Sequence, residues 1–228
     1  MRKQYDNLRD YEKTIDERPM NKYYERPFII SLLPELKHKL FVDAGCGTGY
    51  FSLYAQNKGA NVIAIDISDR MLYLVNKANP NIETHKFDME KRIDFLEKES
   101  VDIIVSSLVL HYVNDWTNFI ESSYDVLKKG GKLILSFNHP VYSYVKNIDN
   151  TYFDKKIVSK VWKVEPNNFT VESYIRPLGE VMGYILNKGF SEVNIYEPRP
   201  EEKYRDELGK KFERLDTKPS FMFVELIK

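Results

Sequence analysis

The feature that most constrains this chain is an apolar run that ends in an acid and is followed by glycines at every second position. Residues 40–42 are apolar and lead into Asp43. The glycines are Gly45, Gly47 and Gly49. Apolar residues then recur with helical spacing over residues 50–55, so the pattern predicts a strand, a tight turn and a helix. Glycine suits such a turn because a ligand approaches the backbone without meeting a side chain. Free N–H groups at the helix start bind polar ligand atoms, so the stretch predicts a nucleotide-type cofactor site.

The residues around these glycines indicate which cofactor the site takes. A dinucleotide fingerprint requires glycine at position 50, where this chain has Tyr50. Asp43, at the strand end, is placed to accept a hydrogen bond from an amine, as in the amino-acid part of a ligand. We interpret Cys46, the only cysteine, as a small residue that fits the loop rather than as a nucleophile.

The stretch Asp-Ala-Gly-Cys-Gly-Thr-Gly over residues 43–49 resembles the first motif of class I S-adenosylmethionine-dependent methyltransferases. The resemblance implies S-adenosyl-L-methionine as the cofactor and S-adenosyl-L-homocysteine as the product. It also implies a set of cofactor-binding residues within the motif: Asp43, Gly45, Cys46, Gly47 and Gly49.

A second carboxylate follows at the spacing that a ribose-binding residue requires. Residues 61–67 read as a buried parallel strand that ends at Asp66, about 20 residues after the first glycine. The two carboxylate oxygens accept hydrogen bonds from the vicinal ribose hydroxyls. The resemblance implies that Ile67 packs on the adenine, with help from Met71. A helix N-cap is the alternative role for Asp66, although Ser68 is available for capping.

Two further segments extend the resemblance. A short strand over residues 82–87 leads to Asp88 and Met89. The resemblance implies that the Asp88 carboxylate binds the adenine amine and that Met89 presents its backbone N–H to the adenine. An ordinary loop residue is the alternative for Asp88. The strand over residues 101–105 leads to Ser106, where the family has its fourth motif. The Pro-Pro-Tyr and Pro-Cys motifs of nucleic-acid methylators are absent there, so the pattern favours a small-molecule acceptor.

Two histidines lie where a general base would act. His111 follows the fourth motif, and His139 follows the fifth strand. Histidine titrates near neutrality, and a positioned base contributes roughly 10²–10⁴-fold to a rate. The alternative is that each is a loop or core histidine with a satisfied hydrogen bond. Tyr112 and Tyr142 are candidates for holding the substrate or for cation–π attraction to the sulfonium. No two histidines share metal-ligand spacing, so no metal site is expected.

Strands and helices alternate between residues 38 and 137 without hairpin signals, which predicts an α/β fold with a doubly wound, mostly parallel sheet. The resemblance implies seven strands with the last one antiparallel, a Rossmann-like methyltransferase fold. We expect one domain over residues 1–228. Its parts are an N-terminal helical arm or lid (1–26), a cofactor-binding core (27–139), a substrate-side insertion after the fifth strand (140–175), and a C-terminal helix with closing strands (176–228). A solvated arm and a surface embellishment or dimer contact are the alternatives for the first and third parts.

The charge balance bears on partners. The 34 basic residues match the 34 acidic ones, so no global basic field indicates nucleic acid as a partner, although a local patch remains open. No apolar run reaches the roughly 20 residues that span a bilayer, and the polar N-terminus does not resemble a signal peptide. We therefore expect a soluble cytoplasmic protein, a monomer or homodimer, without a membrane partner.

The most favoured function is methyl transfer from S-adenosylmethionine to a small molecule by in-line displacement. Two alternatives remain: a regulatory module that binds the cofactor without transferring methyl, and, less favoured, an NAD-dependent dehydrogenase. An RNA or protein acceptor ranks lower because no basic tail is visible. The acceptor and the atom methylated are not determined by the sequence.

Overall fold

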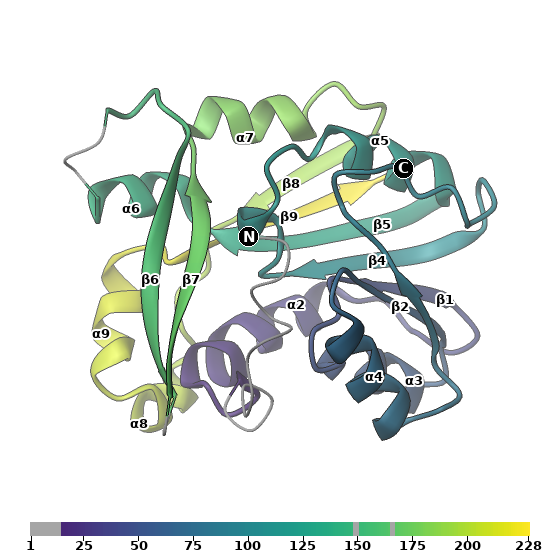
Figure 1. The fold of residues 1–228 in the computed structure, drawn as a ribbon, viewed down its shortest axis with the longest axis horizontal. Helices are drawn as coiled ribbons and strands as arrows, with labels where there is room; N and C mark the ends of the chain where they lie inside the picture. Colours follow the sequence, from purple (N-terminus) through teal and green to yellow (C-terminus); the bar gives the residue numbers. More distant parts are fainter. Residues whose placement is uncertain (1–14, 148–150, 165–166) are drawn as a thin grey trace.

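A computed structural model describes residues 15–147, 151–164 and 167–228. Residues 1–14, which make up over half of the expected N-terminal arm, lie outside the described residues. The described chain forms one seven-stranded sheet and one two-stranded sheet (Figure 1). The prediction of an α/β fold with a doubly wound, mostly parallel sheet is confirmed. The division of the chain at residues 27, 140 and 176 stays a prediction.

The main sheet has the strand order β3-β2-β1-β4-β5-β9-β8. Strands β3, β2, β1, β4 and β5 pair in parallel, whereas β9 is antiparallel to both β5 and β8. The order reverses between β1 and β4, where open α/β sheets bind their ligands. The strand bounds are β1 Leu40–Ala44, β2 Asn61–Asp66, β3 Glu83–Lys86, β4 Val101–Ser107, β5 Leu127–Asn138, β8 Glu192–Tyr196 and β9 Phe221–Ile227.

Helices cover both faces of this sheet. In Figure 1, α2, α3 and α4 lie on one side, and α5 and α7 lie on the other. The helix bounds are η1 Asn21–Glu25, α2 Arg26–Leu32, α3 Tyr50–Asn57, α4 Asp69–Ala78, η2 Leu110–Tyr112, α5 Thr117–Val126, α6 Pro140–Val145, α7 Leu178–Ile185, η3 Glu202–Tyr204, α8 Arg205–Leu208 and α9 Lys210–Thr217.

The core follows from the alternation of side chains along each strand. Phe41 packs with α2, α3 and α4, whereas its neighbour Val42 packs with α5 and α7. Both side chains are fully buried, as expected for a strand in the middle of a parallel sheet covered on both faces. This core holds the carboxyl ends of β1, β2 and β4 in fixed positions relative to one another.

The insertion after the fifth strand contains α6 and a β-hairpin. Strands β6 Lys156–Val164 and β7 Asn167–Ile175 pair antiparallel as a separate sheet. The hairpin stands at the end of the main sheet where β4 and β5 finish (Figure 1). Lys160 of β6 and Val171 of β7 are directly paired.

Three helix ends differ from the sequence pattern. The pattern predicts a helix over residues 27–37, but α2 ends at Leu32 because Leu33, which precedes a proline, is extended. The pattern also predicts a helix over residues 116–128, but α5 ends at Val126 because Leu127 pairs with the start of β4 instead. It further predicts a helix from residues 176–180 to a stop at Gly189, but α7 ends at Ile185.

Candidate functional site

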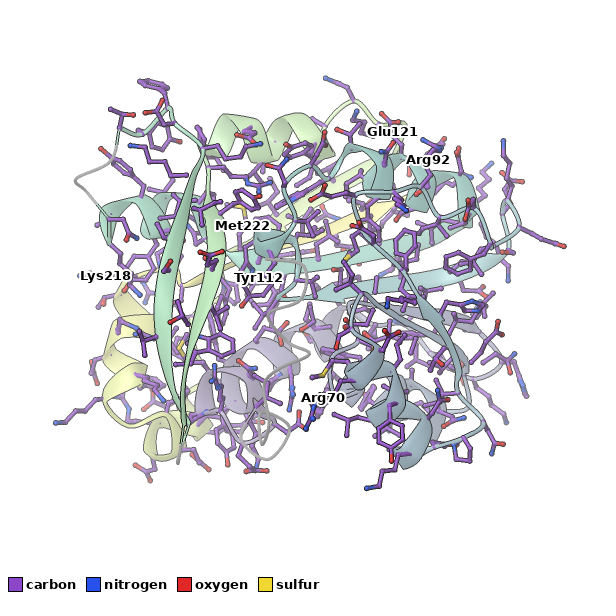
Figure 2. The ribbon with its side chains drawn as sticks, viewed as in Figure 1. Arg70, Arg92, Tyr112, Glu121, Lys218 and Met222 are labelled. Atoms are coloured by element: carbon purple, nitrogen blue, oxygen red, sulfur yellow. The ribbon has the colours of Figure 1, made fainter. Side chains whose placement is uncertain are left out.

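A cavity of about 580 Å³ lies at the carboxyl ends of β1, β2 and β4. Its walls come from the glycine loop, from the loops after β2, β3 and β4, from η1, and from β6 and β7. Tyr112, at the end of η2, lies between the sheet and the hairpin (Figure 2). The volume is in the usual range for small-molecule sites, and the position at the switch point of the sheet is the usual one.

The glycine loop is held against the neighbouring strand by its backbone. The N–H groups of Gly45 and Cys46 donate to the carbonyl of Ile65, at 2.7 and 3.0 Å. Gly45 has a φ of +77°, and a Cβ there would lie 2.4 Å from a methyl of Val109. Gly49, with a φ of +87°, immediately precedes α3 and is not among the residues that line the cavity. The glycines therefore shape the turn and leave its backbone open to a ligand.

Asp43 is buried at the end of β1 and lines the cavity. Its Oδ2 accepts hydrogen bonds from the backbone N–H and the hydroxyl of Ser52, at 2.9 and 2.6 Å. Burial raises the pKa of Asp43 to about 7, although the Ser52 bonds oppose the shift. A cationic ligand group beside Asp43 would stabilise its ionised form.

Asp66, at the end of β2, also lines the cavity and is tied to the glycine loop. Its Oδ2 accepts from the N–H of Gly47 at 3.0 Å, and its Oδ1 accepts from the N–H of Ser68 at 2.9 Å. Ile67 and Met71 line the same part of the cavity. Ser68 caps α4 by accepting a hydrogen bond from the N–H of Met71, so Asp66 is not needed as that cap.

Asp88 and Met89, which follow β3, line the cavity too. Asp88 Oδ1 accepts from the N–H of Glu90 at 3.1 Å, which orients the carboxylate. The structure therefore brings three carboxylates from the ends of three neighbouring strands to one cavity. Ser106 does not join them: its hydroxyl is buried without a hydrogen-bond partner, and Ser107 lines the cavity instead. The alternation along β4 explains this one-residue difference.

The two candidate histidines have different surroundings. His139 is not among the residues that line the cavity. Its Nδ1 accepts from the N–H of Tyr142 and caps α6, and its Nε2 pairs with Glu197. His111 lines the cavity, and burial together with the charges of Arg176 and Lys160 lowers its pKa to about 3. His111 Nδ1 accepts from the N–H of Asn138 at 3.4 Å, so the neutral ring carries its proton on Nε2.

The sequence pattern did not reveal two buried charged residues of the cavity, Glu25 and Arg26. Glu25 Oε1 accepts hydrogen bonds from the hydroxyls of Ser107 and Ser136, at 2.8 and 2.5 Å. Burial raises the pKa of Glu25, and the two serines oppose the shift. Glu25 and Arg26 lie where a π-helical turn, η1, joins α2, and such turns often mark functional sites. A Glu-Arg pair within a polar helical segment carries no periodic signal, so no sequence pattern indicates that these two residues line a cavity.

Arg26 lies beside the glycine loop. Its guanidinium stacks on the Tyr50 ring at 3.8 Å and pairs with Asp16, which in turn accepts a hydrogen bond from the Thr48 hydroxyl at 3.2 Å. Arg26 therefore places a positive charge next to the start of α3, where a ligand carboxylate would bind.

Nearby, Leu108 has a positive φ of 54° directly after β4. Such a conformation is uncommon outside glycine and concentrates at functional sites.

Within the described ranges, no three His, Cys, Asp or Glu side chains come together as a metal site requires. None of the helices in the described part of the chain combines the length and apolarity needed to cross a membrane.

Comparison with known proteins agrees with this geometry. A family model described as a methyltransferase domain matches residues 42–135. A Haemophilus influenzae protein described as uncharacterised is 25% identical over 92% of this chain and 89% of its own length. A malonyl-(acyl-carrier protein) O-methyltransferase of Pectobacterium atrosepticum is 28% identical over 56% of this chain, which spans only 46% of that relative.

The likeness in fold extends over nearly the whole chain. The crystal structure of an S-adenosylmethionine-dependent methyltransferase from Mesorhizobium loti superposes with a TM-score of 0.72 at 24% identity, covering 92% of this chain and 100% of that one. Fold and cavity define a doubly wound α/β protein with a nucleotide-type cofactor site. Residues 42–135 match the model of a methyltransferase domain, and the chain has the fold of solved S-adenosylmethionine-dependent methyltransferases.

Proposed function

We propose that this chain transfers a methyl group from S-adenosylmethionine to a small-molecule acceptor by in-line displacement. The observation that carries the proposal is the continuity of the cavity. It begins at the glycine loop and the three strand-end carboxylates, and it continues past η2 to the face of the hairpin that bears Lys160 and Trp162. One cavity therefore offers space for a cofactor and for an acceptor beside it.

Different residues of the chain are assigned to different parts of the cofactor. We assign Asp66 to the ribose hydroxyls, Asp88 to the adenine amine, and Asp43 to the ammonium of the amino-acid part. Ile67, Met71 and Met89 supply apolar surface for the adenine. These roles rest on the lining of the cavity and on the chemistry of each side chain. When bound, the cofactor supplies an activated methyl group on a sulfonium, so the protein's task is alignment, worth roughly 7–11 kcal/mol.

Glu25 is a better candidate base than either histidine. His111 has a pKa of about 3 and presents Nε2–H, so it is suited to donate a hydrogen bond to the acceptor rather than to take its proton. His139 is engaged as a helix cap. Glu25 lines the cavity and has a raised pKa, the condition that favours proton transfer near neutral pH. Where the acceptor loses a proton, we assign that proton to Glu25.

The experiment that tests the function combines binding with turnover. The purified protein is titrated in a calorimeter with S-adenosylmethionine, S-adenosylhomocysteine and NAD, and S-adenosylhomocysteine release is then followed with a panel of small acceptors. We expect both sulfur ligands to bind, NAD to bind negligibly, and at least one acceptor to turn over. Binding without any turnover would favour the regulatory module, and binding of NAD instead would favour a dehydrogenase.

Cofactor affinity should rise with pH through Asp43. In the free protein the pKa of Asp43, about 7, keeps its carboxyl protonated over a pH range in which an exposed aspartate is ionised. The free energy of unfolding that this proton binding contributes is therefore lost as pH rises from about 4 to 7. An ammonium requires the ionised form, so binding releases a proton below pH 7. We expect S-adenosylmethionine affinity to rise about tenfold per pH unit between pH 5 and 7. Calorimetry at several pH values measures this, and Asp43→Asn should remove the slope. A flat profile for the unmodified protein would exclude Asp43 from this role.

The candidate base is tested by matched substitutions. Glu25→Gln keeps the shape of the side chain but cannot accept a proton, so we expect turnover with the acceptor found above to fall by roughly 10²–10⁴-fold. S-adenosylhomocysteine affinity should stay within about threefold. His139→Ala should cost about 1 kcal/mol through the lost cap and leave turnover per folded molecule unchanged. If His139→Ala abolishes turnover at constant folded fraction while Glu25→Gln does not, the assignment is reversed.

A further inference from the structure

Three cations from separate segments of the chain line the cavity. Arg18, Lys160 and Lys211 line it, from the segment before η1, from β6 and from α9. Burial lowers the pKa of Lys160, and the charges of Lys146, Arg18 and Arg214 lower it further. The pKa of Lys146 is likewise lowered by burial and then by Arg214. Four cations from four segments, Arg18, Lys146, Lys160 and Arg214, therefore lie close enough to repel one another, and Lys211 lines the same cavity.

None of these cations has a counter-charge among the residues that the structure describes. Among the ion pairs of the described residues, none involves Arg18, Lys146, Lys160, Lys211 or Arg214, and no acid raises the pKa of Lys160 or Lys146. By contrast, Lys155 and Lys156, near the start of β6, pair with Glu180 and Asp154 at 3.3 and 3.7 Å. These two lysines, which do not line the cavity, thus have acidic partners.

Aromatic rings hold two of the cations in place without neutralising them. The Arg18 guanidinium lies 3.9 Å over the Trp162 ring, and the Lys146 ammonium lies 4.4 Å over the Tyr142 ring. A stacked guanidinium keeps its N–H groups in the plane of the fork, where they bind a carboxylate or a phosphate. The cluster is therefore ordered and still able to bind an anion.

The cluster is distinct from the cation placed for the cofactor. Arg26 lies at the glycine loop, beside Tyr50 and Thr48, where the carboxylate of an amino-acid part would reach it. Lys160 is on the hairpin beyond η2, near enough to His111 to lower its pKa. An anion held by Lys160 would therefore belong to a molecule that lies beside the cofactor.

We propose that the methyl acceptor of this protein carries an anionic group, a carboxylate or a phosphate, which binds between Lys160, Arg18 and Lys211 while its nucleophile points toward the cofactor. This inference rests on the function proposed above. An anion at this point offsets the mutual repulsion of the cations, and the hairpin that carries Lys160 encloses it. A neutral or cationic acceptor would leave the mutual repulsion of these cations unrelieved.

The test uses inorganic phosphate and malonate as probes on the protein saturated with S-adenosylhomocysteine. Calorimetric titration should show that at least one probe binds and that added salt weakens its binding. Lys160→Met and Lys211→Met should each weaken it about tenfold, the usual loss for one charge-assisted hydrogen bond. Lys156→Met, the same change on the same strand away from the cavity, should leave it unchanged. All three variants should keep their S-adenosylhomocysteine affinity. Phosphate alone binding would identify a phosphorylated acceptor, and malonate alone a carboxylate.

The outcomes separate this inference from the proposed function. If S-adenosylhomocysteine binds but neither anion does, or if Lys160→Met and Lys211→Met leave anion binding unchanged, the anionic acceptor is excluded and the methyltransferase proposal stands. Turnover confined to neutral or cationic members of the acceptor panel would exclude it in the same way. If S-adenosylhomocysteine itself fails to bind, the proposed function and this inference both fail.

Discussion

Replacing Asp66 with alanine is expected to weaken the binding of S-adenosylmethionine and S-adenosylhomocysteine by at least about 100-fold. The variant lacks the carboxylate to which we assign the two ribose hydroxyls, so it loses two hydrogen bonds, each worth roughly 1.5–3 kcal/mol. It also loses the bond from the Gly47 N–H at 3.0 Å, which holds the glycine loop beside β2. Calorimetry with both ligands measures the effect, and circular dichroism establishes that the variant is folded.

The control for this substitution is Asp69→Ala. Asp69 lies in the first turn of α4, three residues further on, and its largely exposed carboxylate pairs with Lys86. Its loss removes the same charge from the same neighbourhood without touching the cavity, so cofactor affinity should change by less than about threefold. Equal losses for the two variants would mean that charge near β2, rather than a bond from Asp66, supports binding.

Gly45→Ala is expected to lower the free energy of unfolding by about 2 kcal/mol or more and to abolish measurable cofactor binding. Its φ of +77° costs a residue with a Cβ roughly 1–2 kcal/mol. In addition, the Cβ would lie 2.4 Å from a methyl of Val109, a residue of the cavity wall, so the loop or Val109 must move. Urea unfolding gives the stability, and calorimetry with S-adenosylhomocysteine gives the affinity.

The matched control is Gly183→Ala in α7. No atom lies within 4 Å of a Cβ added at Gly183, and its backbone is helical, so the substitution should stabilise the protein by roughly 0.5–1 kcal/mol. A Gly45→Ala variant as stable and as tightly binding as the unmodified protein would show that the loop tolerates a side chain. The glycine requirement inferred for the turn would then be wrong.

The cofactor half of the site was accessible from the sequence because its signals are local. Asp43 and Asp66 lie at the carboxyl ends of β1 and β2, and Asp88 follows β3 by two residues, and parallel strands bring their carboxyl ends to one edge. Once the alternation of strands and helices is recognised, convergence of these three side chains follows from topology. The glycine turn is likewise readable because positive φ values restrict the residue type. The sequence analysis placed Ser106 in the site, whereas Ser107 lines the cavity. Neighbouring residues of a strand point to opposite faces, and the pattern does not show which of the two faces the cavity.

The acceptor half was not accessible, because its residues meet only through packing. Glu25 bonds hydroxyls 82 and 111 positions away along the chain, and the cations around Lys160 come from four separate segments. His139 follows a strand in the sequence just as His111 does, yet its ring turns to cap α6 and pair with Glu197. No periodic pattern encodes such meetings, since they depend on how the hairpin and η1 pack at the end of the sheet.

The sequence by itself therefore determined the α/β class, the glycine turn and the carboxylates that the strand ends bring to the cavity. These features depend on strand and helix periodicity and on backbone conformation within short stretches. Only the tertiary structure decided that Glu25 is buried in the cavity wall, that His111 stays neutral, and that Lys160 has no acidic partner among the described residues. Burial and the distances between charges set those properties, and both arise when remote segments pack together.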